Sequence, residues 1–336
     1  MRFSDHLQKN IIETHAGRLL SKFKIKSRRD VLFFEDILVD YIKECEKNGY
    51  EKEIRNVSKK WMNLTMQQMT PKILKKAPLF FLNKIMKNLW VSLGLMSDLS
   101  IIKSENIIEI KTKNETPTRV IGENNFIVGF YEGILNILFK SNLKCIKFLQ
   151  TKRHCKYTFN IEDEPFDFIK CKEKEVYNKL NQLPESVGID FKSALKKGIF
   201  NLKKDNKIYF RGKSIILGEN TLSHLISNSN LLPEKIPYIS YDFFKKIIKE
   251  DSTDEEKLVL IKTILQIMGW GIIKVKKSKK YILMEIKNPP YGLQSEKDNW
   301  EFLIRTVLGY LWLLDKDFVV KNIKEQYKKL IILYSK

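Results

Sequence analysis

Residues 129–162 read GFYEGILNILFKSNLKCIKFLQTKRHCKYTFNIE, and this stretch decides the fold class. From Phe126 to Phe139 the sequence is apolar nearly all round, which predicts a helix buried on more than one face. Two alternating segments, residues 141–150 and 155–162, follow on either side of a short polar turn. They predict an antiparallel hairpin, because a period of two is typical of strands with one buried face.

Cys145, His154 and Cys155 lie in this hairpin and raise the question of a metal or redox site. If Gln150 faces Cys155 across the turn, the register places Cys145 opposite Asn160. At about 3.3 Å per residue, the two cysteine positions are then roughly 16 Å apart along the ladder, too far for one metal ion. Zinc sites usually contain close pairs such as CxxC, and the sequence has none. We therefore predict small buried residues on a strand, with no metal and no cofactor.

Upstream of the buried helix, residues 101–113 alternate around a polar Ser-Glu-Asn turn and predict another hairpin. Before this hairpin, apolar residues recur at helical spacing in three segments. We expect helices over residues 4–20 and 30–48 and between Met69 and Leu93.

The same order returns in the second half of the chain. Around Gly269 a helix ends in GWG and is followed by a hairpin (residues 271–288), a long apolar helix (residues 299–314) and a final hairpin (residues 317–335). The offset stays near 175 residues over about 70 positions, although identities are sparse. Order and spacing therefore predict a tandem duplication.

The expected fold class is α+β, with two similar domains. Each domain is a twisted antiparallel β-sheet of two hairpins packed against several α-helices. We expect the first domain over residues 1–170 and a second, more diverged domain over residues 171–336, since a chain of 336 residues is long enough for two cores.

One unit is thus helices, hairpin, buried helix, hairpin. This order, with GFYEGILNILF, the alternating strand after it and CKYTF, resembles the 4-vinyl reductase domain family, whose wider ligand-binding fold occurs in nitric-oxide-sensing haem domains and Golgi transport-particle subunits. The resemblance covers about residues 60–162 and 235–335. Cys155, Tyr157 and Phe159 match the end of the family pattern, whereas the turn TKRH lacks its earlier cysteine and its glycine, and the second copy has no cysteine at all.

The resemblance implies a small-molecule or hydrocarbon pocket between sheet and helices, and pairing of the two domains as an internal pseudo-dimer. The candidate ligand-binding residues are Gly129, Phe130, Gly133, Cys155 and Tyr157. Gly129 and Gly133 lie one helical turn apart, although a glycine costs about 1 kcal/mol relative to alanine in a helix. Either a neighbouring helix or strand, or a bound ligand, comes close to this face.

The net charge of +21 favours a second hypothesis, a nucleic-acid-associated protein with a Lys-rich surface. The charge is spread evenly, with 29 − 19 = +10 over residues 1–165 and 32 − 21 = +11 over the rest. Only nine basic residues are arginine, whereas base and phosphate recognition favours the guanidinium group. The candidate contacts are Lys276, Lys277, Lys279 and Lys280, which a solvated hairpin turn would also explain.

No catalytic motif emerges from the sequence. The segment RGKS, residues 211–214, ends like a phosphate-binding loop, but Lys207 stands where the first glycine is needed, so a basic turn between strands is the simpler interpretation. Neither HExxH nor GxSxG occurs. Glu132 lies among apolar neighbours and is either a carboxyl with a raised pKa or a helix residue that reaches solvent or pairs with a lysine.

No apolar run approaches 18 residues, and the start MRFSDHLQKN lacks the apolar core of a signal peptide. We therefore expect no membrane insertion and a cytoplasmic location. The richness in Lys, Ile and Asn is typical of an AT-rich genome and fits an archaeal or thermophilic source. The first hypothesis is a non-enzymatic sensor or adaptor that binds a hydrocarbon, lipid or tetrapyrrole-like molecule in its first domain. A third is a structural subunit with a protein partner.

Overall fold

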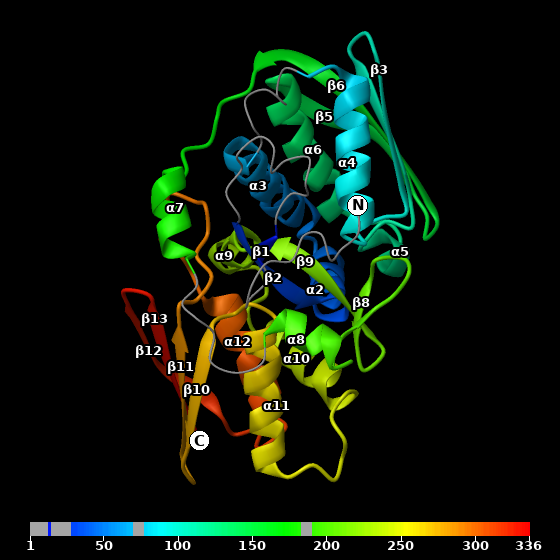
Figure 1. Ribbon diagram of the computed structural model, residues 1–336. Helices are drawn as coiled ribbons and strands as arrows, with labels where there is room; N and C mark the ends of the chain where they lie inside the picture. The colour runs from blue at the N-terminus through cyan, green and yellow to red at the C-terminus, as the bar shows by residue number, and fades with distance from the viewer. Residues whose placement is uncertain (1–12, 15–27, 70–76, 183–189) are drawn as a thin grey trace.

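A computed structural model describes residues 13–14, 28–69, 77–182 and 190–336 (Figure 1). The elements up to residue 170, the first half, are β1 (Glu13–Thr14), β2 (Arg28–Phe34), α2 (Glu35–Lys47), α3 (Glu51–Met69), α4 (Leu79–Ser92), β3 (Asp98–Ser104), β4 (Ile107–Lys113), α5 (Thr118–Ile121), α6 (Asn125–Phe139), β5 (Ser141–Gln150) and β6 (His154–Pro165). Those of the second half are α7 (Lys174–Leu180), α8 (Phe191–Lys196), β7 (Asn201–Leu202), β8 (Ile208–Phe210), β9 (Lys213–Glu219), α9 (Thr221–Ser229), α10 (Lys235–Lys245), α11 (Asp254–Ile267), β10 (Ile272–Lys277), β11 (Tyr281–Lys287), α12 (Glu301–Leu311), β12 (Val319–Gln326) and β13 (Lys329–Ser335).

Within the described residues, the strands form three antiparallel sheets with helices packed against them, which confirms the predicted α+β class. Two sheets have four strands, in the orders β3-β4-β6-β5 and β10-β11-β13-β12. The first hairpin of each unit therefore pairs with the second in the same way. Both sheets lie at the outside of the molecule, with helices on their inner side (Figure 1).

The second unit repeats the first at the predicted offset. β10 begins 174 residues after β3 (272 − 98), and β13 begins 175 residues after β6 (329 − 154). Each first hairpin follows a helix, α4 or α11, and each second hairpin follows a buried helix, α6 or α12. All four predicted hairpins are confirmed, because alternating burial of apolar residues places one face of each sheet in the core.

The helix α6 is buried from Phe126 to Leu138, as its apolar sequence predicted. It begins at an N-cap, Asn124, whose side chain accepts a hydrogen bond from the backbone N–H of Ile127 at 3.0 Å. It ends at Lys140, whose φ of 56° turns the chain into β5. The helix lies between α3 and β5, so nearly all its side chains are in the core.

The helix predicted over residues 30–48 is confirmed from Glu35 to Lys47 as α2, but its first five residues are wrong, because residues 28–34 form the strand β2. The run from Val31 to Phe34 is fully buried and apolar, and such a run fits a buried strand as well as a helix. The pairing partner of β2 is β9, almost 190 residues away in sequence, so no local pattern could reveal it. The helix predicted over residues 4–20 falls largely outside the described residues, and Glu13–Thr14 within it pair with β2 as a strand.

The five-stranded sheet, in the order β1-β2-β9-β8-β7, joins strands from both halves. Its centre pairs Leu32 of β2 with Leu217 of β9. In addition, α3 packs against α9 and α10 packs against α2, so each half contributes equivalent helices to the contact with the other. Arg211 and Gly212 form the turn between β8 and β9, as predicted for the RGKS segment.

A bulge in the second hairpin changes one predicted pairing. Gln150 faces Cys155 as expected, but Cys145 pairs with Phe159 and not with Asn160. The register shifts between Cys145 and Lys147, because an extra residue on β5 displaces the ladder by one position. Among the described helices, none has the length and apolar character that crossing a bilayer requires.

Candidate functional site

Gly129 and Gly133 of α6 face the backbone of α3. A Cβ atom at Gly129 would lie 2.8 Å from the carbonyl carbon of Arg55 and closer still to its oxygen. At Gly133 it would lie 2.7 Å from the Cβ of Met62. Of the two explanations for these glycines, the structure shows the neighbouring helix at this face.

The second unit contains the same helix contact. A Cβ atom at Gly309 of α12 would lie 2.8 Å from the Cβ of Ser240 and would overlap the carbonyl oxygen of Pro237 in α10. Gly133 meets Lys59 and, three residues on, Met62, whereas Gly309 meets Pro237 and, three residues on, Ser240. Gly309 is therefore the structural counterpart of Gly133.

Phe130 packs in an aromatic cluster at the core of the first half. Its ring centroid lies 5.8 Å from that of Trp61 and 5.4 Å from that of Trp90. The neighbouring Tyr131 lies 5.4 Å from Phe130 in an edge arrangement. These rings fill the space between α3, α4 and α6 in the first half.

Tyr157 belongs to a buried polar cluster around Glu115, which is 1% exposed. The carboxylate of Glu115 accepts hydrogen bonds from the hydroxyls of Tyr157 at 2.5 Å, Thr118 at 2.8 Å, Thr112 at 3.0 Å, and Tyr131. Burial raises the pKa of Glu115, and the four hydroxyl donors oppose that rise. The cluster ties the loop after β4 to α6 and β6.

Cys155 lies beside this cluster, at the floor of an open depression of about 340 Å³ on the first sheet. Burial raises the pKa of the Cys155 thiol to about 11. The thiolate, which is the reactive form, is therefore scarce at neutral pH, so Cys155 is a poor nucleophile. Among the described residues, no group of three or more His, Cys, Asp or Glu side chains is placed to hold a metal ion.

Glu132 pairs with two basic side chains of α3. Arg55 donates through Nε at 3.2 Å and through Nη2 at 2.5 Å, and Lys59 Nζ lies 3.9 Å from the carboxylate. The backbone N–H of Cys145 also donates to Glu132 at 3.0 Å. Glu132 is buried and does not reach solvent, so of the interpretations the paired one describes the structure. The ion pair and the hydrogen bond from Cys145 join α6, α3 and β5.

The four lysines predicted to contact nucleic acid occupy different places. Lys276 lies on the outer face of β10, and Lys277 pairs with Asp254 at 2.9 Å. Lys279 and Lys280 are exposed in the turn between β10 and β11. The structure therefore does not bring these four ammonium groups together on one face.

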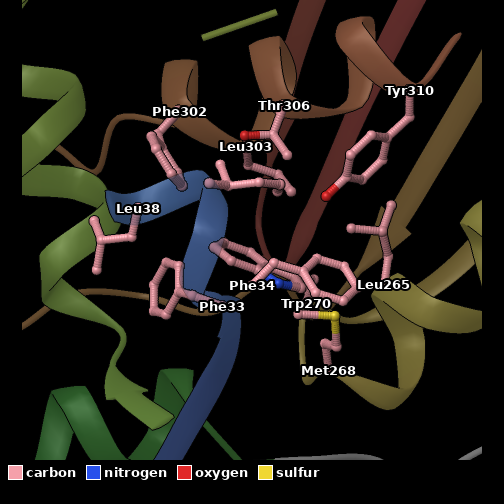
Figure 2. Close-up of a pocket in the computed structure, with 11 residues that line it drawn as sticks. Phe33, Phe34, Leu38, Leu265, Met268, Trp270, Phe302, Leu303, Thr306 and Tyr310 are labelled. Carbon is pink, nitrogen blue, oxygen red and sulfur yellow. The ribbon is translucent and has the colours of Figure 1, made fainter. Parts of the chain in front are cut away.

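A narrow apolar cavity lies at the junction of the two halves (Figure 2). One wall is β2 and α2, and the other is α12 with the end of α11 and the residues after it. Its volume is about 20 Å³, room for roughly one water molecule. The lining residues are Phe33, Phe34, Ile37, Leu38, Leu265, Met268, Trp270, Phe302, Leu303, Thr306 and Tyr310.

The lining carries two buried hydroxyl groups, and the hydroxyl of Thr306 has no hydrogen-bond partner among the described residues. Thr306 is 8% exposed and Tyr310 is 2% exposed, one turn apart on α12. The ring of Tyr310 points from α12 toward Phe34 and Trp270 (Figure 2). Burial alone raises the pKa of Tyr310, with no other group acting on it. A buried hydroxyl without a partner, such as that of Thr306, is rare, so this cavity is the candidate functional site.

The first half carries larger side chains at the positions that correspond to Thr306 and Leu265. Thr306 lies three residues before Gly309, as Phe130 lies three residues before Gly133. Leu265 is the twelfth residue of α11, and Trp90 is the twelfth residue of α4. The threonine and leucine are smaller than the phenylalanine and tryptophan, whose rings lie 5.4 Å apart in the first half.

Sequence reasoning missed this site because it placed the pocket in the first half. The lining residues come from β2, α2, α11, α12 and the GWG turn, and each looks like ordinary core in its own segment. One signal was present: within the apolar α12 segment, Thr306 and Tyr310 are polar residues four apart. Compared with known proteins, the sequence matches no protein-family model and no curated protein.

Proposed function

We propose that this protein is a non-enzymatic sensor or adaptor in the cytosol that binds a small, mostly apolar molecule in the cavity between its halves. The observation that carries this proposal is the buried hydroxyl of Thr306, which has no partner among the described residues, beside the buried hydroxyl of Tyr310 in an otherwise apolar lining. Ligand sites typically combine apolar walls with a few polar groups that orient the ligand. The 4-vinyl reductase-like resemblance and an internal pseudo-dimer of two domains belong to the same proposal.

The lining sets the chemistry of the ligand. It contains no charged side chain, and burying an unpaired charge costs several kcal/mol, so the ligand is neutral. At about 20 Å³ the cavity is far smaller than a tetrapyrrole or a lipid chain needs. A small hydrocarbon-like molecule fits after the flexible side chain of Met268 and its neighbours move aside.

The position of the cavity explains how binding acts. β2 and α2 come from the first half, whereas α11 and α12 come from the second half. A ligand that widens the space moves α12 relative to β2 and therefore changes how the halves sit together. Such a ligand binds the arrangement with the wider cavity more tightly than the arrangement with the narrower one. Binding therefore shifts the population toward the wider arrangement, by an amount set by the difference between the two affinities.

Native mass spectrometry of protein purified from its own host tests the proposal, and thermal unfolding with xenon and toluene as neutral probes complements it. We expect a co-purifying neutral molecule or a raised Tm with a probe. The variant Leu265→Phe places a larger side chain in the lining, so the probes should no longer raise its Tm. Absence of any bound molecule together with unchanged Tm for every probe would contradict the proposal.

Thr306→Val should raise the free energy of unfolding by about 1 kcal/mol, because valine has nearly the same shape and removes a buried hydroxyl without a partner. Urea denaturation measures the change. The matched control is Thr221→Val, since the Thr221 hydroxyl accepts a hydrogen bond from the Leu293 N–H at 2.8 Å. That control should lower stability, and a loss of stability in both variants would show that the Thr306 hydroxyl has a partner.

A further inference from the structure

We infer that the outer face of the second four-stranded sheet, in the order β10-β11-β13-β12, binds single-stranded nucleic acid. This surface, the lysine face, is independent of the cavity. It consists of Lys274, Lys276, Lys287, Lys324 and Lys329 around Tyr281, Leu283, Ile331 and Leu333, with Glu285 as its acidic residue.

The lysine face exists because buried and exposed side chains alternate along the strands. On β11 and β13, residues such as Ile282, Met284 and Ile332 are buried, whereas their neighbours Leu283 and Ile331 are partly exposed. The buried side packs against α11 and α12. The opposite side faces outward at the edge of the molecule (Figure 1).

The charge of the face is strongly positive. Its five lysines oppose one acid, so the net charge is 5 − 1 = +4. Glu285 pairs with Lys329 at 2.9 Å. Lys274, Lys276, Lys287 and Lys324 form no ion pair with any described residue, and a surface that holds four unneutralised ammonium groups attracts a polyanion.

The arrangement of apolar and basic residues favours a single strand. Leu283 and Leu333 lie on the two central strands, whereas Lys276 and Lys324 lie on the two outer strands. A single strand can place unstacked bases on the apolar centre while its phosphates reach the lysines. A duplex hides its base faces, and an acidic protein surface offers few flat apolar groups. The Tyr281 ring, 45% exposed, supplies a stacking platform.

Fluorescence anisotropy with a labelled oligothymidine strand tests this inference on the full chain. The triple variant Lys274→Gln, Lys276→Gln, Lys324→Gln should bind at least about tenfold more weakly and reduce the slope of log K against log salt by about 2. The control variant, Lys262→Gln, Lys279→Gln, Lys280→Gln, removes the same charge from exposed positions off the face and should bind as the parent does. Tyr281→Ala should weaken binding by about tenfold.

Two competitors decide between partner classes. Unlabelled single strand should displace the probe at lower concentration than either a duplex of equal length or polyglutamate. Equal competition by polyglutamate, with no effect of Tyr281→Ala, would identify an acidic protein as the partner and overturn the inference. Equal weakening in the face and control variants, or no binding at low salt, would also overturn it.

Discussion

The double variant Gly129→Ala, Gly133→Ala should lose about 4 kcal/mol of unfolding free energy, or fail to fold. Each added Cβ atom meets the backbone or first side-chain atom of α3, which no rotamer change can move away. Overpacking of this kind costs up to about 3 kcal/mol per site, and the helix propensity of alanine returns about 1 kcal/mol. Urea denaturation measures the loss.

Gly49→Ala is the control for this experiment. A Cβ atom there would meet nothing within 4 Å, and only the φ of 83° disfavours a side chain. We therefore expect a loss of about 1 kcal/mol. If the double variant were as stable as the parent, α3 would not lie against α6 as described. A bound ligand would then again be the explanation for these glycines.

Glu115→Ala should lower the free energy of unfolding by about 4 kcal/mol. The substitution removes the acceptor of four buried hydroxyls, including those of Tyr131 and Tyr157, and leaves a cavity beside them. Glu115→Gln keeps the shape and one acceptor oxygen, so it should cost less. A loss below about 1 kcal/mol for the alanine variant would contradict the cluster.

The difference in unfolding free energy between the parent and Glu115→Gln should depend on pH. Because burial raises the pKa of Glu115 above its ordinary value of 4.5, the folded state binds the proton more readily than the unfolded state. Its contribution to stability is therefore complete below about pH 4.5 and declines as pH rises through the folded pKa. The parent should lose stability relative to Glu115→Gln over that range in urea titrations, and a difference independent of pH would contradict the raised pKa.

Much of the repeated unit could be predicted from local patterns. The hairpins at residues 101–113 and 271–288 alternate with a period of two, and α6 is too apolar to face solvent. These patterns arise from the burial of each segment against one core, so a single sequence carries them. The prediction was wrong for β2, because a buried apolar run has no period and its partner β9 is distant. It was wrong by one residue for Cys145, because a bulge has no signature in the alternation.

The sequence by itself determined the α+β class, the order of hairpins and buried helix in the repeated unit, and the offset near 175 residues, since each of these depends on contacts between neighbouring segments. Only the tertiary structure decided what lies over Gly129 and where the cavity is. The first is the backbone of α3, and the second is a space between β2 and α2 of one half and α11 and α12 of the other, lined by Thr306 and Leu265. Both depend on how side chains from distant segments fill the space between them, and the pattern within any one segment does not contain that information.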